Sequence, residues 1–278
     1  MWEKQCKKPE SRKNMGRRRS KERKVIYYSD ELNEEFSRAQ ITPRVVDQHF
    51  RYFHGGLWDI CSLAVQNVLS MPVKYLYAKL KFHIRYVGRE KLKNYKNNGY
   101  FMYGNHTQPF ADTFIPSLGN YPKRNFFIVN PENISMPGLG TLVEMLGAIP
   151  IPCDLGGMKN FIRSVEDKIE RNHSVTIYPE AHIWPYYIGI RPFKAVSFQY
   201  PVKLECPVFA VTNTYHRRGR KGEKVKLVTY IDGPFFADRT LNPKEARQKL
   251  RDQVYACMVE RSKCSDQEYI EYRRREDT

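Results

Sequence analysis

A chain of 278 residues can bury one sizeable core, and 41% hydrophobic residues without an excess of Gly or Pro exclude a largely disordered protein. The formal net charge is +17, of which residues 1–24 contribute +8, because they hold eleven Lys or Arg and three Glu. A charge of this size indicates an anionic partner. Three interpretations of the N-terminal basic run remain open: a solvated tail, a tether to acidic lipids, and an arm that binds nucleic acid.

The N-terminal part of the chain is expected to hold a flexible basic tail over residues 1–24 and a helical, membrane-facing segment over residues 25–86. Within this segment Leu57, Ile60, Val65 and Val68 belong to an apolar series with helical spacing, and Pro72 is expected to end or kink the helix. The stretch from Trp58 to Phe82 interleaves aromatic residues with Lys, which is typical of a helix in a membrane interface. Packing of the same helix on the core is the alternative.

Targeting and spanning segments are not indicated. No apolar signal region follows the N-terminal methionine, and the longest uncharged apolar-leaning run, residues 60–73, is too short and too polar to cross a bilayer. The six cysteines include no Cys-x-x-Cys pair, so neither a zinc site nor a disulfide framework is indicated, and a reducing cytosol is expected.

From residue 84 onwards the chain alternates between strand and helix patterns. Helices are indicated by the apolar stripe that begins at Met158 and by Asn242, Pro243 and Glu245, which resemble the start of a capped helix. Strands are expected over residues 100–103, 125–129, 149–152, 174–178, 208–213 and 224–231. We therefore predict an α/β fold, with a mainly parallel central sheet flanked by helices and an N-terminal helical extension, in which residues 87–278 form one domain.

Four short blocks stand where loops leave the expected strands. They are residues 104–112 (Gly-Asn-His-Thr-Gln-Pro-Phe-Ala-Asp), 146–152, 177–182 (Ile-Tyr-Pro-Glu-Ala-His) and 206–211. Because loops at one edge of a parallel sheet converge on a shared crevice, these blocks are expected to line one site. In the first block, Asp112 is expected to orient His106, which would then act as a general base without a Ser or Cys nucleophile.

The order and spacing of these blocks resemble the glycerolipid acyltransferase family, whose members include the 1-acyl-glycerol-3-phosphate acyltransferases. The resemblance covers about residues 84–235 and includes an Asn-His…Asp block, a Pro-Glu block and a Phe-Lys element at Phe193 and Lys194. It implies acyl transfer from a coenzyme A or acyl-carrier-protein thioester to a lysophospholipid hydroxyl, with no cofactor or metal. It also implies His106 and Asp112 as catalytic residues. The substrate-binding residues that it implies are Asn105, Pro179, Glu180, His182, Phe193 and Lys194.

The chain departs from the family pattern at three places. Five residues rather than four separate His106 from Asp112, so the pair must be made by an irregular turn. Cys153 and Ile183 stand near positions where the family carries arginines that the pattern implies for holding the acceptor phosphate. Replacement charge would come from Arg163, Arg191, Lys194, Lys203, Arg217 or Arg218.

The resemblance therefore predicts a phospholipid-biosynthesis enzyme located at the cytoplasmic membrane face, peripherally associated with an anionic surface. Acylation of a non-phosphate acceptor and a catalytically silent lipid-binding relative are the alternatives. A nucleic-acid-binding protein is a further alternative, but no specific nucleic acid is expected, because the chain shows no recognition helix or base-stacking module.

Overall fold

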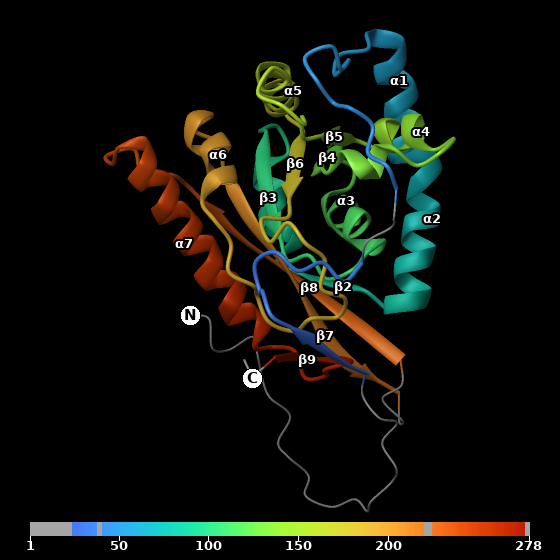
Figure 1. Ribbon diagram of the computed structural model, residues 1–278, viewed down its shortest axis with the longest axis vertical. Helices are drawn as coiled ribbons and strands as arrows, with labels where there is room; N and C mark the ends of the chain where they lie inside the picture. The colour runs from blue at the N-terminus through green and yellow to red at the C-terminus, as the bar shows by residue number, and fades with distance from the viewer. Residues whose placement is uncertain (1–23, 38–40, 220–223, 276–278) are drawn as a thin grey trace, which may run out of the picture.

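A computed structural model of the protein describes residues 24–37, 41–219 and 224–275. All but the last residue of the basic tail expected over residues 1–24 therefore lies outside the described residues. Figure 1 shows a central sheet with helices on both sides, and α1 and α2 run along one flank of the molecule.

The central sheet has seven strands in the order β2-β8-β7-β3-β6-β4-β5. Five of them, from β7 to β5 in that order, are parallel to one another, whereas β8 is antiparallel to β7 and β2 is parallel to β8. The strands are β2 (Arg85–Val87), β3 (Tyr100–Gly104), β4 (Asn125–Val129), β5 (Ala148–Pro150), β6 (Ser174–Ile177), β7 (Val208–Arg218) and β8 (Lys224–Phe235). The mainly parallel sheet that the sequence pattern predicts is confirmed.

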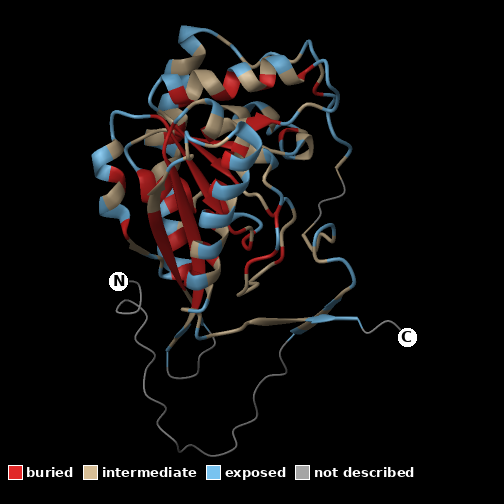
Figure 2. Ribbon diagram, turned by 90° about the vertical axis from the view of Figure 1, so that its left-hand side faces the viewer, coloured by how far each residue is buried: buried red, intermediate tan, exposed pale blue. Residues whose placement is uncertain are grey.

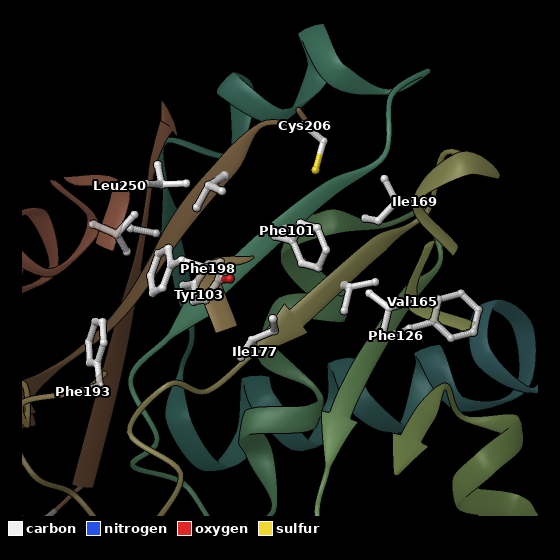
Figure 3. Close-up of a cluster of buried hydrophobic side chains, with 14 of the residues drawn as sticks. Phe101, Tyr103, Phe126, Val165, Ile169, Ile177, Phe193, Phe198, Cys206 and Leu250 are labelled. Atoms are coloured by element: carbon white, nitrogen blue, oxygen red, sulfur yellow. The ribbon is translucent and has the colours of Figure 1, made fainter. Parts of the chain in front are cut away.

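Every residue of β3 is buried, and alternate side chains serve two different cores. Phe101 and Tyr103 belong to a cluster that α5 (Met158–Glu170) and α7 (Pro243–Ser262) cover on one face (Figure 3). Tyr100 and Met102 belong to a second cluster on the other face, beside the 3₁₀ segment η4 (Arg89–Tyr95). Figure 2 shows the strands as the most deeply buried elements.

The two helices with recognisable sequence signals form where they were expected. The apolar stripe that begins at Met158 lies on α5, and α7 begins at Pro243, with Asn242 as its cap. The Asn242 side chain accepts hydrogen bonds from the backbone amides of Lys244 and Glu245, which satisfies two amides of the first turn. The remaining short helices are α3 (Ile115–Asn120), α4 (Gly140–Met145) and α6 (Gln199–Lys203), with 3₁₀ turns η5 (Ala111–Thr113), η6 (Pro131–Ile134) and η7 (Val196–Phe198).

The N-terminal helical stretch is shorter than expected but passes through Pro72. It runs without a break through α1 (Gly56–Ala64), the π-helical turn η2 (Val65–Leu69), α2 (Ser70–Tyr77) and a second π-helical turn η3 (Ala78–Phe82). Pro72 does not end it, because the wider π turn just before it relieves the clash between a proline ring and the preceding turn. Gly55 and Gly56 mark its start, and residues 41–54 before it form neither helix nor strand.

Up to Lys74 this stretch has polar side chains turned inward, and further on Ala78 and Phe82 are buried; we call its opposite side the apolar face. Ser62, Gln66 and Lys74 are buried at spacings that place them on one helix face. The apolar face consists of the exposed side chains Leu57, Ile60, Leu63, Val68, Leu69, Val73, Tyr75, Leu76 and Leu80, which are 44–78% exposed. This arrangement is the reverse of the usual pattern for a helix that packs on a water-soluble core.

The two ends of the described chain meet in a second, two-stranded sheet that the sequence pattern did not predict. Strand β1 (Lys24–Tyr28) pairs in parallel with β9 (Ile270–Arg274), with Ile26 opposite Tyr272. This pair of terminal strands, which we call the ribbon of terminal strands, is separate from the main sheet in Figure 1. It brings aromatic side chains from both ends of the chain to the loop that follows β6.

The thiols differ in one respect from the expectation. Cys61, Cys153, Cys206 and Cys257 are free, whereas Cys264 is disulfide-bonded, which the cysteine spacing did not predict. Within the described ranges, no cluster of three or more His, Cys, Asp and Glu side chains could hold a metal ion. In the same ranges, no helix is long and apolar enough to span a bilayer.

Candidate active site

The first and third sequence blocks lie side by side at the carboxyl edge of the sheet. Strand β3 pairs with β6, and Tyr103 lies opposite Ile177. Both strands end within one residue of this pair, so the loops that begin at Asn105 and at Tyr178 leave the sheet together. This is the edge of a parallel sheet at which α/β proteins commonly bind ligands.

His106 and Asp112 form a hydrogen-bonded pair in the first of these loops. The distance between His106 Nδ1 and Asp112 Oδ2 is 2.8 Å, and the imidazole is 19% exposed while the carboxylate is buried. No hydrogen bond joins Nε2 of His106 to another residue in the described part of the chain. A carboxylate that accepts from Nδ1–H leaves Nε2 as the proton acceptor at the surface, which is the arrangement a general base requires.

An irregular turn makes this contact, as the spacing of six positions demands. Asp112 Oδ2 also accepts hydrogen bonds from the backbone amides of Thr107 and Gln108, both at 2.9 Å. The Tyr215 hydroxyl donates to Thr107 Oγ1 and accepts from Gln108 Nε2, at 2.7 and 2.8 Å. Asp112 therefore holds the imidazole and the turn at once, and β7 braces the turn from below.

Asn105 and Asn213 fasten the start of the loop to β7. The Asn105 side chain accepts from the backbone amide of Asn213 at 2.8 Å and donates to its carbonyl oxygen at 3.1 Å. The Asn213 side chain in turn donates to Asp112 Oδ1 at 3.3 Å. Asn105 is fully buried, so its place is beneath the site rather than in contact with solvent.

Glu180 supports His106 through the backbone. Its Oε2 accepts from the His106 backbone amide and its Oε1 accepts from the Arg191 backbone amide, both at 3.1 Å. The Arg191 guanidinium lies 3.5 Å from the same carboxylate, and both side chains are buried. Glu180 thus frames the loop and does not face the open side of His106. Arg191, one candidate source of charge for a substrate, is committed to this pair and to the His182 carbonyl oxygen.

Two rings and two backbone bonds complete the surroundings of the histidine. The Tyr178 ring is stacked on the His106 ring, with a centroid separation of 4.4 Å and an interplanar angle of 17°. The backbone amides of Trp184 and Tyr186 donate to the carbonyl oxygens of His106 and Thr107. Trp184 is itself stacked on Tyr272 of β9, so the ribbon of terminal strands supports this loop.

Burial and hydrogen bonding shift the pKa values of the two carboxylates of the site in opposite directions. Desolvation raises the pKa of Asp112, and the hydrogen bonds from His106, Gln108 and Thr107 oppose that rise. Desolvation likewise raises the pKa of Glu180, and the charge of Arg191 and the two backbone amides oppose it. Each buried carboxylate therefore depends on its donors to remain charged.

The other predicted binding residues are placed less uniformly. Pro179 and His182 belong to the same loop as Glu180, and His182 Nδ1 lies 3.6 Å from the Glu35 carboxylate. Phe193 is only 4% exposed and packs in the core beside Tyr255, whereas Lys194 is exposed. The structure thus brings Asn105, Asp112 and Glu180 to His106 but places Phe193 in the core.

The second and fourth blocks do not join the first and third as expected. Strand β5, which carries the second block, is the edge strand of the sheet, with β4 and β6 between it and β3. The fourth block leads into the start of β7, where Val208 pairs with Phe101 at the amino edge of the sheet. Strand β7 contributes Asn213 and Tyr215 instead. Asn213 is the last residue of the strand expected over residues 208–213, and Tyr215 lies two residues beyond it. The sequence did not link either residue to the site, because their contacts depend on strand order.

Comparisons with known proteins agree with this architecture. The acyltransferase family model matches residues 83–214, which include β3, the His106 turn, β6 and the Glu180 loop. A search of curated protein sequences finds no match. The fold is similar to the crystal structure of the 1-acyl-sn-glycerophosphate acyltransferase PlsC from Thermotoga maritima, with a TM-score of 0.51 and 16% sequence identity. That similarity covers 74% of this chain and 83% of the PlsC chain. Residues 83–214 thus match the model of the acyltransferase family, which is the family that the motifs of this chain resemble.

Proposed function

We propose that this protein transfers a fatty acyl group from an acyl thioester, acyl-CoA or acyl-carrier protein, to the hydroxyl of a lysophospholipid. The 2.8 Å pair of His106 and Asp112 at the carboxyl edge of β3 carries this proposal, because among the described residues nothing forms a hydrogen bond with Nε2 of His106. The family match and the PlsC-like fold support the same class of reaction. The thioester is the only co-substrate that the proposal requires.

In the proposed reaction, Nε2 of His106 accepts the proton of the acceptor hydroxyl while that oxygen attacks the thioester carbonyl carbon. Asp112 keeps the imidazole in the required tautomer and stabilises the imidazolium. When the tetrahedral intermediate collapses, the C–S bond breaks and the thiolate takes the proton from Nε2. The products are the new ester and the free thiol, and His106 returns to its starting state.

We further infer that the protein works at an anionic membrane surface through the apolar face of residues 56–82. Exposure of this face to water is unfavourable, whereas its contact with acyl chains is favourable. Residues 75–89 contain four Lys or Arg, all of them exposed, and no Asp or Glu, so the same region complements acidic head groups. Lys79 and Lys81, which are exposed at the end of the stretch, suit the boundary between the two layers.

A non-phosphate acceptor is a second candidate, and one contact favours it. Where the family pattern carries an arginine, the backbone amide of Ile183 donates to Glu35 Oε2 at 3.0 Å, and His182 lies near the same carboxylate. A carboxylate at this place repels a phosphate dianion instead of attracting it. The acceptor panel below therefore includes lysolipids with and without a terminal phosphate.

The test is acyl transfer from labelled acyl-CoA and acyl-carrier protein to that panel. We expect transfer by the wild type and a loss of about 10²–10⁴-fold in His106→Ala, with a comparable loss in Asp112→Asn. His49→Ala is the matched control, because His49 is exposed and lies outside this site. Transfer that does not depend on His106 would reject the general-base role. No transfer by folded, vesicle-bound wild type would reject the enzyme and favour a lipid-binding relative.

A further inference from the structure

One large hydrophobic side chain projects from the catalytic turn itself. Phe110 lies between His106 and Asp112 and is 60% exposed. The other members of the turn point their polar groups inward to Asp112 and Tyr215. The turn is held by these hydrogen bonds and by Ala111, which packs in a buried hydrophobic cluster, whereas most of the Phe110 side chain faces outward.

Phe110 is joined to the N-terminal helical stretch by aromatic contacts. Its ring centroid lies 5.5 Å from that of Tyr77, at the end of α2, and 4.7 Å from that of Phe114. Tyr77 and Phe114 are 5.7 Å apart, so the three rings form one edge-to-face cluster. On α2 and η3, Leu76 and Leu80 flank Tyr77 and are 56% and 68% exposed. The exposed part of Phe110 thus continues the apolar face.

The same end of the helix carries groups suited to the level of lipid head groups. Lys81 Nζ donates to the Tyr77 hydroxyl at 2.8 Å, and Lys79 Nζ lies 5.4 Å from the centroid of the Tyr75 ring. Tyrosine and lysine side chains commonly lie where an apolar layer meets water, with their apolar parts in the layer. Phe110 is next to this boundary, a short turn away from His106.

We propose that Phe110 inserts with the apolar face into the acyl-chain layer of an anionic phospholipid surface, and so holds His106 at the lipid boundary. This inference rests on the membrane contact in the proposed function and adds the catalytic turn to the contacting surface. Hydrogen bonds within the turn hold its geometry, and the insertion of Phe110 sets the depth at which the turn lies relative to the lipid surface. Substrates whose acyl chains remain in the bilayer would then present their reacting groups at the level of Nε2.

The direct test is Phe110→Trp with vesicles of phosphatidylglycerol and brominated phosphatidylcholine, after subtraction of the wild-type tryptophan signal. We expect the added fluorescence to shift to shorter wavelength and to be quenched by bromine. Phe236→Trp is the matched control, because Phe236 is 51% exposed and follows β8 at the amino edge of the sheet. Its signal should change little. An unquenched Phe110→Trp signal, whether or not the protein sediments with vesicles, would overturn the proposal.

A kinetic test separates lipid contact from a role in the turn. In Phe110→Ala, the ratio of transfer to an acceptor in vesicles over transfer to a monomeric short-chain acceptor should fall about tenfold. An equal loss on both acceptors would overturn the proposal, because it would indicate a role in the turn or the substrate pocket. His106→Ala should lose transfer to both. If the wild type transfers an acyl group to neither acceptor, the proposed acyltransferase function is rejected. The fluorescence experiment then still tests whether Phe110 contacts lipid.

Discussion

The carboxyl edge of the sheet and the helical stretch of residues 56–82 bury opposite kinds of side chain. At the sheet edge, the buried groups are charged or polar, and each oxygen of Asp112 and Glu180 accepts at least one hydrogen bond. Along the helix, most of the exposed side chains are apolar, and an ammonium group, that of Lys74, is buried. Each region departs from the usual arrangement of a water-soluble protein, and each departure indicates what the region contacts.

The difference shows that burial has to be interpreted together with partners. A buried carboxylate with several donors is a means of holding a reactive turn in one geometry. A buried polar helix face opposite an exposed apolar one indicates that the apolar side has a partner other than water. The three predictions below test the comparison at the sheet edge, on the apolar face and on the inward polar side of the helix.

The largest effect is expected at the sheet edge, from Glu180→Gln. In the wild type, the two carboxylate oxygens of Glu180 accept hydrogen bonds from two backbone amides. The NH2 group of glutamine would face one of these amides and could not accept its hydrogen bond, and the buried Arg191 guanidinium would lose the charge of this carboxylate. The free energy of unfolding, measured in urea, should fall by about 3–5 kcal/mol. Glu166→Gln is the control, because the pair of Glu166 with Lys203 is exposed and should contribute less than about 1 kcal/mol. Unchanged stability with a raised KM would instead make Glu180 a substrate ligand.

The apolar face is expected to respond to Leu69→Ser combined with Val73→Ser. These side chains are 67% and 63% exposed, so unfolding stability should change little while vesicle binding weakens by roughly tenfold for each residue. Sedimentation with vesicles rich in phosphatidylglycerol measures the change. Leu155→Ser combined with Val196→Ser is the control, since both side chains are exposed elsewhere on the surface. Equal losses in the two double variants would remove the distinction between this face and ordinary exposed residues.

The smallest effect is expected on the inward side of the helix, from Lys74→Met. Desolvation lowers the pKa of Lys74 from 10.5 to about 8, so between these pH values the unfolded chain binds more protons and wild-type stability rises with pH. At pH 7 the buried charge is a cost, and the variant should be more stable by about 2 kcal/mol. That advantage should shrink as the pH rises from 8 towards 10.5. A variant that is less stable at pH 7 would show that the ammonium has a favourable partner.

Much of the fold follows from local patterns in the chain. The buried run of β3, the alternation of strands and helices, and the Asn242-Pro243 start of α7 are properties of short windows, and the structure confirms them. The terminal ribbon and the passage of the helix through Pro72 were not predictable in this way. The first depends on two segments more than 240 residues apart, and the second depends on a π turn that tertiary packing stabilises.

For the site, the chain by itself determined the reactive types: a histidine after a buried strand, a carboxylate six positions later and a glutamate after the neighbouring strand. These could be identified because residue chemistry and short spacing are local properties. Only the tertiary structure decided that Glu180 supports the backbone of His106, that Phe193 packs in the core, and that Asn213 and Tyr215 brace the turn. Strand order and burial decide these roles, because side chains from β3, β6 and β7 become neighbours only when the sheet has formed.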